Sequence, residues 1–355
     1  MTVRIGILGT GWGTRIQAPC FRLAGMEITA LGARTPEKAA RVAHELDIPF
    51  YSADHRRVIE RADVDLVSIT TPPYLHAEAA VAALEAGKHV LCEKPTALNA
   101  AEAEAMYAAA RARPDQLALI DHELRFLPLR QRMREMIAGG AVGRLLHVET
   151  GWTSSSRLEP ARPWTWWSDQ AAGGGILGAL GSHLIDTLTW LLDLPVTRVN
   201  ADLRTFVTPR RDVEGKTRPV TADDYCTMQL RFGDDVSGVA VMSTVTPGPD
   251  RHHVTVTGAE GALQLDGEYL YRLGPGGSEP ELVGGPDDIA LPQGVTAGEF
   301  ARGTVALGRA LQRVLGEGDT AALAPAADFE QGLHLQQVVD AARASSATGA
   351  GVSLV

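Results

Sequence analysis

Lys94 is the residue whose type and position point most directly to chemistry. It lies in the run Cys92-Glu93-Lys94-Pro95, which follows the apolar, strand-like residues 89–91. The chain opens with a similar stretch, residues 4–8, which leads into the glycine turn Gly9-Thr10-Gly11-Trp12-Gly13. Such a turn between a strand and a helix is typical of a nucleotide site. A lysine at a strand end in the same half of the chain predicts proton transfer beside a redox cofactor.

The glycine turn is a variant of the GxGxxG fingerprint. Gly9 permits the tight turn, and Gly11 lets backbone N–H groups approach a pyrophosphate. The third glycine of the pattern is replaced by Thr14, and Gly13 comes one place early. Its position after a strand and before a helix favours a dinucleotide site over a plain glycine-rich turn.

The end of the second expected strand bears on the choice of cofactor. An NAD site usually has an acidic residue about 20 positions past the glycines, which binds the ribose 2′-hydroxyl. Here Ala33 takes that place, and Arg34, Thr35 and Lys38 supply donors for a 2′-phosphate. We therefore expect NADP(H) to be preferred over NAD(H). The alternative is that these residues are only a solvated helix start.

A proline turn follows the expected strand at residues 66–69. Thr71, Pro72 and Pro73 can form a wall over the cofactor's ribose and nicotinamide, with His76 close behind. The same residues also fit a strand stopped by proline before a new helix, with His76 on a helix face. The two interpretations are compatible.

The elements around these motifs predict a doubly wound sheet. Short apolar runs alternate with alanine-rich helical runs, which is the pattern of βαβ units. Expected strands cover residues 4–8, 27–33, 66–69, 89–91 and 117–120, and expected helices cover residues 15–24, 36–46, 74–86 and 100–112. We assign residues 1–122 to a Rossmann NAD(P)-binding domain.

The remainder, residues 123–355, predicts an α+β domain for substrate binding and oligomer contacts. It begins with a helix at 129–138 and a strand at 145–150, and a further helix is expected at 183–192. Six strand-like runs joined by hairpin-type turns then lie between residues 199 and 273, before helices at 298–315 and 326–345. The domain should be an open, largely antiparallel sheet with helices on one face.

The overall composition excludes some classes of partner. The 355 residues carry a net charge of -10, which argues against nucleic acid or an anionic membrane surface as the main partner. Cys20, Cys92 and Cys226 are far apart and suggest a reducing cytoplasm rather than a disulfide framework. No metal-ligand constellation is apparent. No apolar run is expected to approach the roughly 20 residues that span a bilayer.

Several motifs together resemble the glucose–fructose oxidoreductase, inositol dehydrogenase and rhizopine-catabolism family (Gfo/Idh/MocA). These are Gly9-Thr10-Gly11, Thr71-Pro72-Pro73 with His76, the run from Ala86 to Pro95, Arg125-Phe126-Leu127-Pro128, and Gly173-Gly174-Gly175 followed by Gly181-Ser182-His183 and Asp186. They occur in the family's order over nearly the whole chain. The resemblance implies NAD(P)-dependent redox chemistry on sugars or polyols.

The resemblance also implies roles for single residues. Lys94 matches the family's catalytic lysine, which contacts the substrate oxygen and the nicotinamide ribose, and its bond to Pro95 is often cis. Glu93 is expected to orient Lys94 or the carboxamide. His183 matches the general acid/base histidine, and Asp186 matches a second acid three residues further on. A histidine in this apolar setting can alternatively be only a core residue.

One position departs from the family pattern. Dehydrogenases of the family commonly have an aspartate four residues before the histidine, where this chain has Ala179. Glu123, Asp169 and Asp186 are candidates to replace that acid.

The loop that holds Trp152, Trp164, Trp166 and Trp167 has two interpretations. Its rings can stack on sugar faces, so Trp164 and Trp167 are candidate substrate residues, together with Glu123 and Arg125. The commoner role of such a cluster is packing or an oligomer contact. Arg157, Arg162 and Asp169 are candidate polar ligands, or simply solvated loop residues.

We expect an NADP-preferring oxidoreductase that acts on a secondary alcohol or ketone of a sugar or cyclic polyol, assembled as a homodimer or homotetramer through the C-terminal sheet. Two alternatives remain. One is a non-catalytic NAD(P)-binding sensor. The other is a glycosidase-like enzyme that retains and recycles its nicotinamide.

Overall fold

The computed structural model describes residues 1–276, 279–296 and 298–354, and it divides into two compact units. The first contains Met1–Leu127 and Asp288–Leu333, and the second contains Pro128–Asp287 and His334–Val355. Residues 277, 278, 297 and 355 of the expected second domain lie outside the described part. The chain leaves the first unit close to the expected boundary after residue 122. However, assigning everything beyond that point to one domain is wrong, because residues 288–333 return to the first unit.

The first unit is built on a seven-stranded sheet in the order β17-β6-β5-β4-β1-β2-β3. Its strands are β1 (Arg4–Leu8), β2 (Glu27–Gly32), β3 (Phe50–Ser52), β4 (Leu66–Ile69), β5 (His89–Cys92), β6 (Ala118–Ile120) and β17 (Ala327–Asp328). All neighbours pair in parallel except β17, which is antiparallel to β6. The expected Rossmann-like sheet is confirmed, and β3 and β17 are additional strands.

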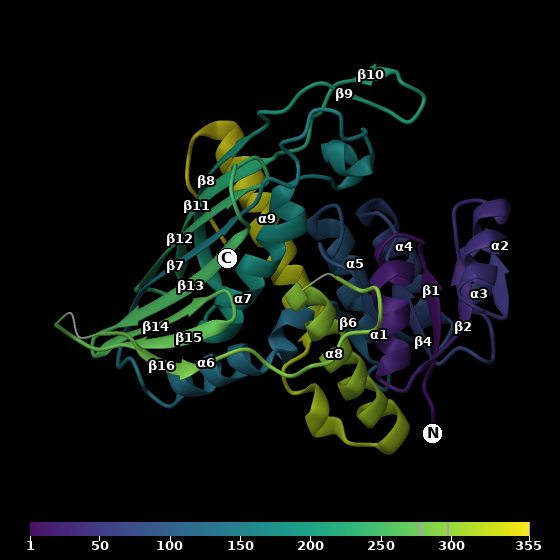
Figure 1. Ribbon diagram of the computed structural model, residues 1–355, viewed down its shortest axis with the longest axis horizontal. Coiled ribbons are helices and arrows are strands. Elements are labelled where there is room, and N and C mark those ends of the chain that lie inside the picture. The colour runs from purple at the N-terminus through teal and green to yellow at the C-terminus, as the bar shows by residue number, and fades with distance from the viewer. Residues whose placement is uncertain (277–278, 297, 355) are drawn as a thin grey trace. The chain divides into compact units, whose positions relative to one another are not determined.

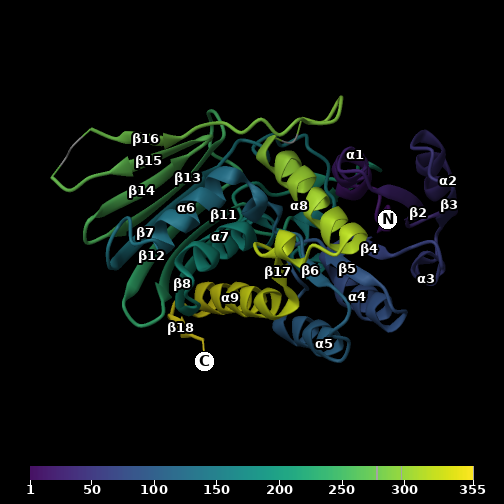
Figure 2. The same ribbon diagram turned by 90° about the horizontal axis from the view of Figure 1, so that it is seen from below.

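Two apolar clusters cover the two faces of this sheet. One joins α4 (His76–Glu85) and α5 (Ala100–Arg111) to residues such as Val67 and Val90. The other joins α1 (Ala18–Leu23), α2 (Pro36–Glu45) and α8 (Gly298–Glu317) to residues such as Ile5 and Leu91. Figure 2 shows α1 and α8 on one side of the strands and α4 and α5 on the other. Helix α8 returns to this unit because Leu307 and Leu311 complete the second cluster.

The second unit is built on a nine-stranded sheet in the order β16-β15-β14-β13-β7-β12-β11-β8-β18 (Figure 1). Its strands are β7 (Leu145–Thr153), β8 (Val196–Arg204), β11 (Tyr225–Phe232), β12 (Val236–Ser243), β13 (Arg251–Gly258), β14 (Gly261–Asp266), β15 (Tyr269–Leu273), β16 (Glu281–Gly284) and β18 (Val352–Ser353). The pairing is antiparallel except between β7 and β12. Helices α6 (Pro128–Ala138) and α7 (Ser182–Leu192) lie along one face, as Figure 2 shows. The expected open, largely antiparallel sheet is confirmed.

Smaller elements complete the chain. The two-stranded hairpin β9 (Arg210–Arg211) and β10 (Thr217–Arg218) projects beyond the end of β8 (Figure 1). Helix α3 (His55–Ile59) and the short helical turns η2 (Pro73–Leu75), η3 (Glu123–Phe126), η4 (Trp166–Ser168), η5 (Gln170–Ala172) and η7 (Thr320–Leu323) lie in the connections. The last long helix, α9 (Phe329–Thr348), begins three residues later than expected.

The expectation about apolar runs needs correction. Residues Gln170–Leu192 form one helical run of 23 residues that is long and apolar enough to cross a membrane. Of its most apolar window, 83% is buried inside the protein, which is the pattern of a core helix and makes this run weak support for a membrane span. From the sequence, Gly178, Gly181, Ser182 and His183 are expected to break this apolar run. In the structure all four residues lie within η6 and α7, so the helix continues through them.

Candidate active-site residues of the two units

The glycine turn in the first unit has the geometry of a phosphate-binding turn. Gly9 has a φ of 119°, and a Cβ atom there would lie 2.6 Å from the Thr70 carbonyl oxygen, so the turn requires glycine. A Cβ at Gly13 would collide with Thr70 and Ile7, whereas none of the described atoms lies within 4 Å of a Cβ placed on Gly11. The exposed Gly11 therefore leaves space for a ligand beside the backbone, and Gly13 provides the close packing expected of the third glycine.

The early third glycine coincides with a local change of helix type. Residues Gly13–Gln17 form a π-helical turn, η1, before α1 begins. A π-turn holds one more residue than an α-turn, and such turns are frequent at functional sites. Trp12 packs edge-on against Phe300 of α8, with the ring centroids 6.1 Å apart. The Phe300 ring therefore supports the glycine turn. Thr10 accepts a hydrogen bond from Thr14 at its carbonyl oxygen.

The end of β2 presents two cations. Arg34 and Lys38 are exposed, and neither side chain makes a hydrogen bond or ion pair with another described residue. Thr35 begins α2, with its Oγ1 accepting a hydrogen bond from the Lys38 backbone N–H at 3.3 Å. Ala33 is buried, so its methyl group belongs to the core and only its backbone can face a cofactor.

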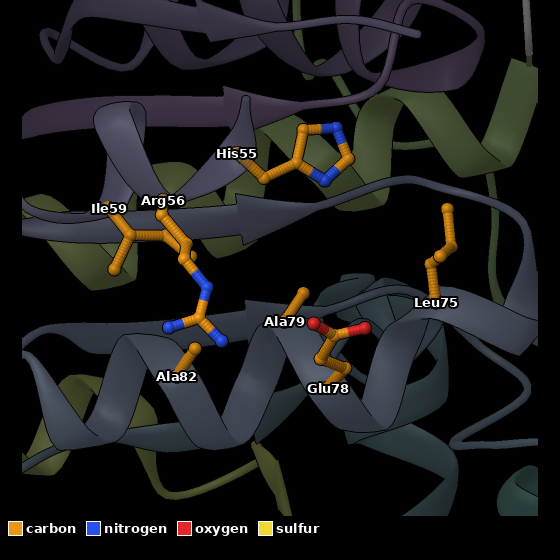
Figure 3. Close-up of a pocket in the computed structure, with 7 residues that line it drawn as sticks. All are labelled: His55, Arg56, Ile59, Leu75, Glu78, Ala79 and Ala82. Carbon is orange, nitrogen blue, oxygen red and sulfur yellow. The ribbon is translucent and has the colours of Figure 1, made fainter. Parts of the chain in front are cut away.

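A small hollow of about 70 Å³ lies next to this strand end (Figure 3). It is lined by His55, Arg56 and Ile59 from α3 and by Leu75, Glu78, Ala79 and Ala82 from the start of α4. His55 also contacts the β2 end, since a Cβ on Gly32 would lie 3.0 Å from its Cδ2. The volume is far below the several hundred Å³ of a typical cofactor site, so the hollow can hold only part of a ligand. Sequence reasoning did not identify His55 or Arg56, although Asp54 caps α3 and marks its start.

His76 connects the proline turn to the turn that carries Lys94. Its ring is buried, with Nε2 2.8 Å from the Thr71 carbonyl oxygen and Nδ1 3.0 Å from that of Pro95. Burial lowers the pKa of His76. Both ring nitrogens are engaged by the backbone, so this histidine holds the two turns in place. The Lys94–Pro95 bond is cis, as the resemblance implied.

Lys94 lies among three buried carboxyl groups. Glu93 precedes it at the end of β5, and Asp121 and Glu123 follow β6. Gln17 joins two of them, because its Nε2 donates to Asp121 at 2.7 Å and to Glu93 at 3.2 Å. Its Oε1 accepts a hydrogen bond from Ser68 at 2.5 Å. We call Glu93, Asp121 and Glu123 the acid cluster.

The acid cluster holds protons more tightly than exposed carboxyls do. Burial raises the pKa of Asp121 to about 6. Burial, and then the charge of Asp121, raises the pKa of both Glu93 and Glu123 well above the usual range. The Lys94 ammonium acts in the opposite direction and lowers all three pKa values. Asp121 Oδ1 and Glu123 Oε2 are sealed from solvent and have no hydrogen-bond partner among the described residues. Lys94 thus lies beside buried carboxyls that keep their protons to higher pH than exposed carboxyls do, and Asp121, with a pKa of about 6, can exchange a proton close to neutral pH.

Arg125 differs from the expectation that it binds substrate. It is buried, and its Nη1 donates to Gln331 Oε1 at 2.8 Å and contacts the Pro325 and Ala326 carbonyl oxygens at 3.3 and 3.4 Å. These groups belong to the segment that returns to the first unit. These hydrogen bonds explain why the Arg125 guanidinium, which belongs to η3, is buried.

In the second unit, His183 and Asp186 lie in the first turns of α7, and both are buried. The π-helical turn η6 (Leu177–Gly181) precedes them. The His183 ring lies against Trp152, with centroids 6.5 Å apart, and Trp152 stacks on His252 at 3.9 Å. The buried Arg130 lies beneath this group, with Nη2 3.2 Å from His252 Nδ1. His183 therefore belongs to an aromatic and polar cluster in the core.

Asp223 is a buried acid of this unit that sequence reasoning missed. Its Oδ2 accepts a hydrogen bond from the Leu177 backbone N–H at 2.7 Å. Its Oδ1 lies so close to Gly175 that a Cβ atom there would collide with it. Burial raises its pKa. Asp169, a candidate to replace the acid absent at Ala179, instead accepts hydrogen bonds from the Ala171 N–H and the Thr221 hydroxyl. Asp186 is buried three residues after His183 in the same helix.

The tryptophans of the loop after β7 have separate environments. Trp152 is in the core, and Trp164 Nε1 donates to the Pro219 carbonyl oxygen at 3.0 Å. Arginine side chains cover Trp164 and Trp167, with Arg218 5.0 Å from the first ring and Arg157 3.7 Å from the second. These contacts support the packing interpretation of the loop.

Comparison with known proteins agrees with the geometry of both units. The model of the oxidoreductase family with an NAD-binding Rossmann fold, GFO/IDH/MocA, matches residues 3–120, and the GFO/IDH/MocA C-terminal domain matches residues 130–264. Glucose-fructose oxidoreductase domain-containing protein 2 from Mus musculus is 35% identical, covering 97% of this chain and 91% of the relative.

Solved structures share the fold over the full length. An aldose-aldose oxidoreductase from Caulobacter crescentus, complexed with glycerol, has a TM-score of 0.78 at 25% identity and covers 100% of both chains. Levoglucosan dehydrogenase, in complex with NADH and levoglucosan, has a TM-score of 0.87 at 24% identity and covers 99% of each chain, which is a similarity of fold. The chain belongs to the GFO/IDH/MocA family and is an NAD(P)-dependent oxidoreductase.

Proposed function

We propose that the protein transfers a hydride between NADP(H) and a secondary alcohol or ketone of a sugar or cyclic polyol. The observation that carries this proposal is the position of Lys94 at the end of β5 among Glu93, Asp121 and Glu123. Similarity to an aldose-aldose oxidoreductase supports a carbohydrate as the substrate.

The residues of the first unit fit a dinucleotide. Gly11 is exposed and has open space beside it, and Gly9 adopts a conformation that other residues rarely reach. Backbone N–H groups of this turn would hold the pyrophosphate. Thr71, Pro72 and Pro73 would border the ribose and nicotinamide. When bound, the nicotinamide supplies hydride chemistry at its C4 atom.

We assign the proton chemistry to Lys94. Its Nζ would hydrogen-bond the substrate oxygen. In oxidation the ammonium would first give a proton to an ionised carboxyl of the acid cluster, and the neutral amine would then take the hydroxyl proton as the hydride leaves for the nicotinamide. In reduction the ammonium would give its proton to the alkoxide that forms. Glu93 and Asp121 would hold protons next to the lysine, and Gln17 fixes the orientation of both carboxyls. His183, supported by Asp186 one turn along α7, would act as a second acid/base group.

The preference for NADP(H) rests on Arg34 and Lys38. Both are exposed cations without a partner among the described residues, at the end of the strand where the ribose 2′-position is held in this fold. A charge-assisted contact to phosphate contributes about 1.5–3 kcal/mol. We therefore expect replacement of both residues by alanine to weaken NADPH binding at least tenfold and to change NADH binding little. Arg41→Ala is the matched control, because Arg41 is an exposed cation on α2 paired with Glu45.

The test of the function is turnover on a panel of aldoses, ketoses and cyclic polyols, followed by the absorbance of the reduced nicotinamide. We expect oxidation of at least one member with NADP⁺, and faster turnover than with NAD⁺ at limiting cofactor. Failure of the purified protein to bind either reduced cofactor would overturn the proposal.

A non-catalytic NAD(P)-binding sensor is the second candidate. The observation that favours it is Ala179, where the family commonly has an acid that partners the histidine. Tight NADPH binding with no turnover across the whole panel would support the sensor instead.

We also propose that the exposed face of the nine-stranded sheet carries the contact between copies of this chain. Large apolar side chains are exposed on its strands, including Val239 (47%) and Leu282 (56%). Along β12, buried and exposed positions alternate from Val236 to Ala240, as expected when one face packs and the other remains open. Sedimentation velocity of the wild type and of Val239→Lys would test this, with dissociation expected for the variant.

A further inference from the structure

The loop after β7 and the segment around β9 form an ordered structure that the proposed chemistry does not use. The loop is fixed by backbone hydrogen bonds at both ends. Arg157 N–H donates to the Thr244 carbonyl at 2.8 Å, Trp164 N–H to Arg211 at 2.7 Å, and Thr221 N–H to Ser168 at 3.0 Å. The side chains held by this loop therefore have defined positions.

A buried arginine lies at the centre of the loop. Arg210 is 4% exposed, and its guanidinium donates only to backbone carbonyl oxygens. Nη2 donates to Arg157 at 2.5 Å, and Nη1 donates to Glu159 at 2.7 Å and to Arg162 at 3.3 Å. These bonds draw residues 157–162 around one cation, which no described carboxylate contacts directly.

Two more arginines are held close to it. Arg162 Nη1 donates to the Ser156 carbonyl oxygen at 2.5 Å. The half-buried Arg157 stacks its guanidinium on Trp167 at 3.7 Å. Burial, and then the charges of Arg162 and Arg210, lowers the pKa of Arg157 to about 9. We call Arg157, Arg162 and Arg210 the arginine cluster.

None of the three guanidinium groups of the arginine cluster forms an ion pair with a carboxylate in the part of the chain that the structure describes. Burial and the charge of Arg162 lower the pKa of Arg210, and the charges of Asp224 and Glu159 act in the opposite direction. Both acids already accept hydrogen bonds from backbone N–H groups, Asp224 from Phe206 and Val207 and Glu159 from Ala161. Neighbouring Arg218 provides a contrast, because it also lies over a tryptophan but is paired with Asp212 at 2.7 Å.

Arg157 has the geometry of an anion ligand. Its flat face is occupied by Trp167, whereas the N–H groups at its edge make no hydrogen bond to a described residue. Its nitrogens are not among the polar atoms sealed from solvent. A guanidinium stacked on an aromatic ring keeps its fork of donors in one plane, which matches the two oxygens of a carboxylate or phosphate.

We propose that the arginine cluster is an oxyanion-binding site. Arg157 hydrogen-bonds a carboxylate or phosphate group, and Arg162 and Arg210 add positive electrostatic potential. Gly174 lies close to Trp167, because a Cβ atom on Gly174 would collide with the Trp167 carbonyl oxygen, and η6 and the helix α7 that carries His183 follow Gly174 in the chain. The site therefore fits an acidic or phosphorylated carbohydrate as the substrate. That last assignment rests on the proposed function, whereas oxyanion binding itself does not.

Binding of simple anions to the full-length protein tests the proposal without turnover. Isothermal titration calorimetry with inorganic phosphate and with glucuronate, at constant ionic strength set by chloride, measures the two sources of oxyanion separately. We expect saturable binding of at least one probe in the millimolar range or tighter. Phosphate alone would indicate a phosphorylated ligand, and glucuronate alone an acidic sugar.

Variants locate the site. Arg157→Gln should weaken binding at least tenfold, and Arg157→Lys, which keeps the charge but not the fork, should weaken it less. Arg218→Gln is the matched control and should change affinity less than about twofold, since that arginine already has an internal partner. Thermal unfolding checks that each variant is folded, and Arg157→Lys remains informative if the glutamine variant is not.

Two results would overturn the proposal. One is the absence of saturable binding for both probes, and the other is equal loss of affinity in the Arg157 and Arg218 variants. A protein that oxidises neutral polyols and binds no anion would refute the oxyanion site while supporting the proposed function. Anion binding by a protein that turns over no sugar or polyol would support the oxyanion site while contradicting the proposed function.

Discussion

Lys94 in the first unit and Arg157 in the second are both half-buried cations, but the charges around them have opposite sign. Lys94 lies with Glu93, Asp121 and Glu123, and its ammonium lowers the pKa of each. Arg157 lies with Arg162 and Arg210, which lower its own pKa. Desolvation penalises the charged form of an isolated group, and the neighbouring groups decide whether the penalty is offset.

The difference separates two kinds of function. Lys94 already has carboxylates as counter-charges. Because the pKa values of the acid cluster are raised, its carboxyls also hold protons that exposed carboxyls would lose, so the arrangement suits proton exchange. An arginine among arginines lacks a counter-charge, so the arrangement suits binding an anion from outside. The two regions should therefore respond differently to mutation, to pH and to added anions.

Removing the lysine should have the largest effect. We expect Lys94→Ala to reduce turnover about 10²–10⁴-fold, the usual contribution of a general acid or base. NADPH affinity, measured by fluorescence, should change less than about threefold if the lysine acts mainly in the transition state. Lys88→Ala is the control, because Lys88 Nζ donates to the Arg61 and Val64 carbonyl oxygens in the connection between α3 and β4. Unchanged turnover in Lys94→Ala would remove the lysine from the mechanism.

The acid cluster should make stability depend on pH in a defined direction. Burial raises the pKa of Asp121 to about 6, so the folded protein binds this proton more tightly than the unfolded chain. Its contribution is fully present below about pH 4 and is lost as the pH rises through 6. Between pH 5 and 7.5 this loss is on the order of 1 kcal/mol.

Asp121→Asn should remove that part of the pH dependence. Urea unfolding at pH 5 and 7.5 measures it as a difference between the variant and the wild type. The control is Asp115→Asn, since Asp115 is exposed just before β6 and should leave the pH dependence unchanged. A stability difference between wild type and Asp121→Asn that does not change between pH 5 and 7.5 would mean that Asp121 is ionised throughout this range in the folded protein.

Added anion should produce the smallest effect, measured with saturating NADPH so that the phosphate-binding groups of the first unit are already occupied. Phosphate at three times its dissociation constant should stabilise the folded protein by about 0.8 kcal/mol, seen as a rise in melting temperature. The rise should persist in Lys94→Ala and disappear in Arg157→Gln. A rise that survives in Arg157→Gln would place the anion elsewhere.

The sequence predicts the residues that lie within one motif better than the groups that surround them. Local patterns include the glycine turn, the Lys94 run and the succession of strands along the first half of the chain. The structure agrees with the positions predicted for all of them. Gln17 is 104 residues from Asp121 and 76 residues from Glu93, and no spacing rule connects them. Their contact depends on the order of strands in the finished sheet.

The same limit explains the arginine cluster and the division into units. Arg157 and Arg210 come from segments 53 residues apart, so each is only a loop arginine in the sequence. Residues 288–333 also give no local sign of their destination, because α8 reads as an amphipathic helix that could pack on either unit. Trp167 was only a candidate sugar platform beside the commoner packing role, since residue type alone does not separate the two, and in the structure Arg157 occupies a face of its ring.

The return of α8 has a consequence for biosynthesis. Leu307, Ala310 and Leu311 complete the apolar cluster around Ile5, Phe21 and Leu91, and Gly303 lets the helix approach the Glu123 backbone closely. A ribosome must add the whole stretch from 128 to 333 after finishing residue 127. At roughly 5–20 residues per second, this takes on the order of 10–40 s. Throughout that interval α1 and α2 cover only part of this face of the nascent sheet, and the apolar surface that α8 later buries stays exposed, so the nascent unit is a natural client for chaperones.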